Sequence, residues 1–246
     1  MVVGTEKKSR VMSEKEKKLT AYHEAGHAIA TYYCKSQDPV HQISIIPRGM
    51  AGGYTMSMPK EDKSYTSKND MLDELVVLLG GRVAESLILG DISTGASNDI
   101  ERATQIARAM VTQYGMSERF GLMGLESVQN RYLDGRAVMN CSDATGALID
   151  EEVKEMLKVA YDKAKKIIED HREVMDEIAE FLIERETITG KEFMEIYNKS
   201  LKKDELESVE ANVEEDKEKT ELSEVETVSE ESSLKDAESQ DAQKVT

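Results

Sequence analysis

Between residues 13 and 200, apolar residues recur mostly at helical spacing. Ser13 followed by Glu16 forms the capping-box pattern that begins a helix, and Pro39 prevents that helix from continuing much beyond Ser36. Leu72, Leu75, Val76, Leu79 and Val83 then lie on one face of a second helix. The predicted helices are Ser13–Ser36, Ser67–Leu89, Ser97–Tyr114 (with Ser97 as its cap), Asp143–Asp170, His171–Arg185 and Thr189–Ser200.

Two short segments have strand patterns instead. Val40–Ile46 and Tyr54–Met58 flank a glycine-rich connection and predict a hairpin or small sheet. Gly115–Cys141 has four glycines and no clear period, and because a structureless loop of that length is unusual, we expect it to be functional or to contain short elements. The predicted fold is therefore mainly α-helical, with a small β hairpin or sheet and a C-terminal helical hairpin.

The chain divides into regions of different composition. We predict a linker remnant at 1–12, a catalytic part at 13–142, a C-terminal helical part of the same domain at 143–202, and a tail at 203–246. Residues 204–246 hold 16 acidic and 4 basic residues and no aromatic residue, so they carry −12 of the net charge of −17. Such a segment buries too little apolar surface to offset its ordering entropy, and we expect it to be disordered.

Composition narrows the classes of function. The net charge of −17 argues against nucleic-acid partners and against an anionic membrane surface. The longest apolar run, Leu75–Leu79, is too short to span a bilayer, and no signal peptide is visible. Cys34 and Cys141 are too few and too far apart for a disulfide framework, which suits a reducing, cytoplasmic compartment.

One motif carries chemistry. His23, Glu24 and His27 form an HExxH sequence inside the first predicted helix. Residues four apart lie one turn apart on the same face, so both imidazoles can bind one metal ion. Two neutral imidazoles at this spacing favour zinc, and Glu24, further round the helix, is placed to act as a general base rather than as a ligand.

A catalytic zinc needs a third protein ligand, and two acids are candidates. Asp99 begins the third predicted helix and lies on its inward face with Ala103, Ile106 and Met110. Glu85 ends the second predicted helix and is also partly inward, either as a ligand or as a partner of a ligand histidine. The spacing alone does not choose between Asp99 and Glu85.

Six segments in this order closely resemble the peptidase domain of the FtsH family of membrane-anchored, ATP-dependent zinc metalloproteases. The resemblance covers about residues 8–200 and is carried by Leu19–Ala28, Pro39–Gly49, Gly52–Thr55, Leu79–Glu85, Ser93–Ile100 and Met116–Gly121. It implies one zinc ion per chain, His23 and His27 as ligands with Asp99 as the third, and Glu24 as catalytic base. Glu85 remains a supporting residue or runner-up ligand.

The resemblance also implies a function and partners. We expect hydrolysis of peptide bonds in unfolded or threaded polypeptides, a homo-oligomer with six members, and a partner ATPase module at the cytoplasmic face of the inner membrane. No GxxxxGK[ST] loop is visible, so the chain has no ATP site of its own and is expected to be a fragment or expressed domain, or else a gene product that has lost its motor. The alternative function is a non-catalytic helical oligomerisation or scaffold module.

Overall fold

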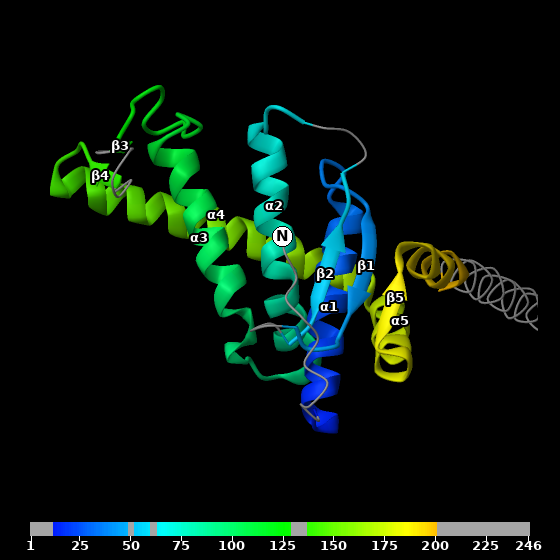
Figure 1. Ribbon diagram of the computed structural model, residues 1–246. Helices are drawn as coiled ribbons and strands as arrows, with labels where there is room; N and C mark the ends of the chain where they lie inside the picture. Colours follow the sequence, from blue (N-terminus) through cyan, green and yellow to red (C-terminus); the bar gives the residue numbers. More distant parts are fainter. Residues whose placement is uncertain (1–11, 49–51, 60–62, 129–136, 201–246) are drawn as a thin grey trace, which may run out of the picture. The chain divides into compact units, whose positions relative to one another are not determined.

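The computed structural model describes residues 12–48, 52–59, 63–128 and 137–200 (Figure 1). The chain forms two units, Met1–Tyr197 and Asn198–Thr246, and the first contains the elements discussed below. The predicted linker 1–12, apart from Met12, and the predicted tail 203–246 lie outside the described residues. Within the described ranges, no helix combines the length and the apolar character that crossing a bilayer requires.

Helix α1 (Glu14–Tyr33) begins at the predicted capping box. The Ser13 hydroxyl accepts from the Glu16 backbone N–H at 3.2 Å, and the Glu16 carboxylate accepts from the Ser13 N–H at 3.1 Å. The helix ends slightly earlier than predicted, because Cys34 already has an extended backbone. Every residue from Thr20 to Thr31 is buried, so α1 is covered on all sides by other elements.

Helix α2 (Lys68–Ala84) crosses α1 at very close range. A Cβ atom on Gly26 would lie 2.6 Å from both the Gly80 carbonyl oxygen and the Ala84 Cβ. The predicted helix 67–89 continues beyond α2 as a π-helical turn, Glu85–Leu89, and stops at Gly90 with φ of 62°. Such wider turns are common at functional sites, and this one contains Glu85.

Helix α3 (Ser97–Thr112) follows a short 3₁₀ turn, Thr94–Ala96. The expectation that Ser97 caps this helix is wrong, because Ser97 is its first helical residue. The Ser93 hydroxyl instead caps the preceding turn, accepting from the Gly95 N–H at 3.0 Å. Helix α3 packs against α2, and this packing brings its N-terminal end toward α1 (Figure 1).

The predicted hairpin is confirmed and belongs to a three-stranded antiparallel sheet. Strand β1 (Val40–Ser44) pairs with β2 (Tyr54–Ser57) on one side and with β5 (Thr187–Thr189) on the other. Strand β5 was missed, because three residues between two helices are too few to show an alternating pattern. Strand β2 is an edge strand of this sheet, which packs against α1.

Segment 115–141, which we expected to be functional or to contain short elements, does contain short elements. Strands β3 (Glu126–Val128) and β4 (Ala137–Met139) form a two-stranded antiparallel sheet. Helices α4 (Asp143–Asp170) and α5 (Arg172–Arg185) follow at the predicted positions, and 190–200 is helical. Helix α4 packs on α2 and α3, whereas α5 packs chiefly on α1, so the mainly α-helical class is confirmed.

Candidate metal centre

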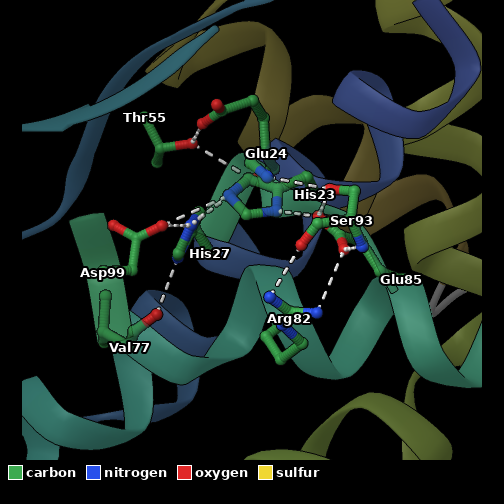
Figure 2. Close-up of polar contacts among 10 residues, drawn as sticks. His23, Glu24, His27, Thr55, Val77, Arg82, Glu85, Ser93 and Asp99 are labelled. Atoms are coloured by element: carbon green, nitrogen blue, oxygen red, sulfur yellow. Dashed lines mark hydrogen bonds and ion pairs between the residues drawn. The ribbon is translucent and has the colours of Figure 1, made fainter. Parts of the chain in front are cut away.

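His23 and His27 lie one turn apart on α1 and direct their Nε2 atoms toward a common point (Figure 2). The two Nε2 atoms are 3.0 Å apart. His23 Nδ1 lies 2.8 Å from Glu85 Oε1, and His27 Nδ1 lies 2.7 Å from the Val77 carbonyl oxygen. Both partners accept hydrogen bonds, so each ring holds a proton on Nδ1 and turns its Nε2 atom toward the other histidine.

Asp99, from the first turn of α3, completes this group. Its Oδ2 atom is 3.4 Å from His23 Nε2 and 3.6 Å from His27 Nε2. One donor atom from each of the three residues lies within 4.8 Å of the others. The structure therefore brings together the three residues that the sequence analysis named as ligands.

The chemistry of this donor set fits a cation. Two imidazole nitrogens and a carboxylate converge on one point, so the site favours a positive charge there, either a proton on a histidine or a metal ion. Burial disfavours a charge on His23, but the carboxylates of Asp99 and Glu85 outweigh burial and raise its pKa to about 10. The same histidines hold the pKa of Asp99 well below its usual range, despite burial. Two imidazole nitrogens and one carboxylate oxygen are a donor set that suits zinc.

Gly81 makes room for the site. A Cβ atom at this position on α2 would lie 2.6 Å from His23 Cε1 and 2.6 Å from His27 Nε2. Sequence reasoning gave Gly81 no role of its own. The sequence feature that could have indicated this role is the Gly80–Gly81 pair inside an otherwise helical segment. A helix-interior glycine costs about 1 kcal/mol relative to alanine, so such a pair indicates a structural need for the missing side chain.

Glu85 lies behind His23, on the side away from the convergent Nε2 atoms. Its side chain is 0% exposed and accepts from His23 Nδ1, from the Ser93 N–H at 2.8 Å and from the Ser93 hydroxyl at 3.0 Å. Arg82 Nη1 is 3.9 Å from Oε2. Burial alone would raise the pKa of Glu85, but the bonds from His23 and Ser93 lower it. Glu85 is thus an anionic partner that orients His23.

Glu24 is 5% exposed and lies beside the two histidines (Figure 2). Its Oε2 atom accepts a hydrogen bond from the Thr55 hydroxyl at 2.8 Å. Burial raises the pKa of Glu24 above its ordinary value, opposed by the neighbouring His27 and His23 and by the Thr55 hydrogen bond. A buried carboxylate with a raised pKa is a suitable proton acceptor. Thr55 was not singled out from the sequence.

Two histidines and a glutamate on a buried helix, with an aspartate from a neighbouring helix, are typical of the HExxH class of metallopeptidases. Residues 10–196 match the model of peptidase family M41, and the chain belongs to this family.

The relatives are longer proteins. The chain is 54% identical over 197 residues to the ATP-dependent zinc metalloprotease FtsH of Clostridium perfringens, covering 80% of this chain and 28% of that protein. It is 52% identical over 201 residues to FtsH 1 of a Thermoanaerobacter species, covering 80% and 33%. The FtsH of Caldicellulosiruptor bescii is also 52% identical, over 199 residues, covering 80% and 32%. The chain thus spans about a third or less of these relatives.

Proposed function

We propose that this chain is a zinc metalloendopeptidase domain that hydrolyses peptide bonds of unfolded or threaded polypeptides. The observation that carries the proposal is the convergence of His23, His27 and Asp99 on one point, beside the buried carboxylate of Glu24. We assign His23, His27 and Asp99 as ligands of one zinc ion and Glu24 as the general base. Glu85 supports His23 and is not a ligand in this proposal.

The residues divide the chemistry between them. When bound, zinc supplies a Lewis acid that polarises the scissile carbonyl and acidifies water. The Glu24 carboxylate accepts a proton from the attacking water and later delivers it to the leaving amine nitrogen. Glu85 keeps the proton of His23 on Nδ1, and the Val77 carbonyl does the same for His27, so both Nε2 atoms stay available.

We further propose that substrate adds to the edge of strand β2 as an extended segment. Strand β2 pairs with β1 on one side, and Thr55 within it contacts Glu24. An added strand is held mainly by its backbone, which suits a peptidase that accepts many sequences. A complex with a peptide analogue that touches no part of β2 would refute this mode of binding.

The finer assignments rest on the resemblance to the FtsH family. We propose that the chain works in a homo-oligomer, expected to be a hexamer, with an ATPase module that unfolds and delivers substrate. We place it in the cytoplasm, at the cytoplasmic face of the inner membrane when it is joined to that module. Parts 13–142 and 143–202 are proposed to form one peptidase domain, because α4 packs on α2 and α3.

A metal analysis combined with one substitution tests the function. The purified chain is expected to hold one zinc ion and to cleave a reduced, alkylated protein. Glu24→Gln should keep the zinc and lose cleavage, because it removes the base but no ligand. A chain without zinc, or a Glu24→Gln variant as active as the wild type, would reject the peptidase assignment and favour the scaffold alternative.

A further inference from the structure

Gly53, directly before strand β2, and Thr55, within it, restrict the two oxygens of the Glu24 carboxylate. The Thr55 hydroxyl donates to Oε2 at 2.8 Å (Figure 2). Gly53 lies against the other oxygen, since a Cβ atom there would be 2.8 Å from Oε1. The direction in which the Glu24 carboxylate points therefore depends on where Gly53 and Thr55 lie.

Thr55 also contacts the backbone of helix α1, which carries Glu24. Its hydroxyl oxygen lies 3.1 Å from the main-chain carbonyl oxygen of Glu24, so one hydroxyl proton is shared between that oxygen and Oε2. Within the part of the chain that the structure describes, Thr55 is the only hydrogen-bond donor recorded for this carboxylate. Without that donor, the buried Glu24 side chain can adopt several rotamers.

The geometry of strand β2 allows Thr55 to contact Glu24 with its side chain and a substrate peptide with its backbone. Successive side chains of a strand point to opposite faces, so Thr55 faces α1 while the strand's backbone groups lie along its edge. A peptide paired along that edge would meet backbone groups, and Glu24 would meet the Thr55 side chain. The two interactions use different parts of the same residue.

We propose that Thr55 is a positioning residue for the peptidase reaction, whose hydroxyl holds the Glu24 carboxylate in its proton-accepting orientation. This inference rests on the proposed function. It predicts that removing the hydroxyl lowers turnover and leaves both substrate binding and the zinc site intact, because neither the β2 backbone nor any ligand is altered.

The experiment compares Thr55→Val, which removes the hydroxyl at similar size, with Thr55→Ser, which keeps it. Thr66→Val is the matched control, since it makes the same change at an exposed threonine outside strand β2 and the metal centre. Zinc content, melting temperature, kcat and KM on an unstructured peptide are measured for each, with Thr55→Ala replacing Thr55→Val if the latter does not fold. Thr55→Val should lower kcat about 10–100-fold with KM changed less than about twofold, and Thr55→Ser should restore most of kcat. Thr66→Val should match the wild type.

A second readout does not depend on activity. In crystal structures of the zinc-loaded variants, the Glu24 carboxylate should leave its place between Gly53 and residue 55 in Thr55→Val and keep it in Thr55→Ser. An unchanged carboxylate in both variants, or equal kcat for Thr55→Val and wild type, would overturn the inference. If the wild type binds zinc but cleaves nothing, the proposed function fails on its own, and the crystal structures still decide whether Thr55 positions Glu24.

Discussion

Glu85 accepts a hydrogen bond from His23 at Nδ1, 2.8 Å away, and so lies on the opposite side of the imidazole ring from Asp99, which is 3.4 Å from Nε2. The two acids that the sequence presented as equivalent candidates thus have different surroundings. Glu85 has its oxygens engaged by His23 and Ser93, whereas Asp99 faces both Nε2 atoms. One supports a histidine, and the other is placed to share a cation with it.

This difference predicts a graded loss of zinc. Asp99→Ala, like His23→Ala and His27→Ala, should lose most of the metal, because each removes a donor atom from the group of three. Glu85→Ala should weaken zinc affinity by about 10–100-fold without abolishing it, as is usual for a partner that orients a ligand. Competition with a chelator, followed by metal analysis, measures the order. Loss of zinc in Glu85→Ala but not in Asp99→Ala would reverse the two roles.

Gly81 provides a steric test of the same site. Gly81→Ala should prevent zinc binding and destabilise the fold, because its Cβ would lie within 2.6 Å of both histidine rings. Gly146→Ala is the matched control: Gly146 lies in α4 with no atom within 4 Å of its added Cβ, so the substitution should stabilise the chain by about 0.5–1 kcal/mol. Zinc content and thermal unfolding of the two variants decide the matter. Full zinc binding by Gly81→Ala would mean that α2 lies further from the histidines.

The sequence predicted what depends on local pattern. The capping of α1 by Ser13, the pairing of β1 with β2 and the placement of two histidines on one face follow from the capping box, the strand alternation and the helical period. The spacing did not choose between Asp99 and Glu85, and only the family resemblance implied Asp99, because the choice depends on how α3 and the turn after α2 pack against α1. Thr55 was not foreseen for the same reason: nothing in its own strand shows that a glutamate of another element lies opposite.

Asp73 gives a prediction on the pH dependence of stability. It accepts from Lys163 Nζ and from the Ser36 hydroxyl, each at 2.7 Å, and so joins α2 to α4 and to the segment after α1. Burial opposes its charge, but these two partners outweigh burial and lower the pKa of Asp73. Because the folded-state pKa is depressed, the stabilisation is present above the ordinary pKa of about 4 and disappears as the pH falls through the folded value.

Asp73→Asn should therefore lower the free energy of unfolding by about 1 kcal/mol at pH 7, with the difference from wild type shrinking below about pH 4. Urea unfolding at several pH values measures it. Asp162→Asn is the control, because Asp162 is exposed and pairs with Lys158 one turn away on α4, an arrangement that contributes little. A loss at Asp73 that does not change with pH would show that the carboxylate charge is not what joins these elements.

The final prediction separates peptide cleavage from unfolding. Hydrolysis at the proposed site needs zinc, water and Glu24, and no nucleotide. Unfolding a native protein costs about 5–15 kcal/mol, and the sequence shows no phosphate-binding loop that could couple ATP to that work. The purified chain should therefore cleave a reduced, alkylated protein slowly and leave the native form of the same protein nearly intact. ATP should change neither rate, a chelator should abolish cleavage, and added zinc should restore it. Stimulation by ATP would contradict this prediction, because it would require a nucleotide site within this chain.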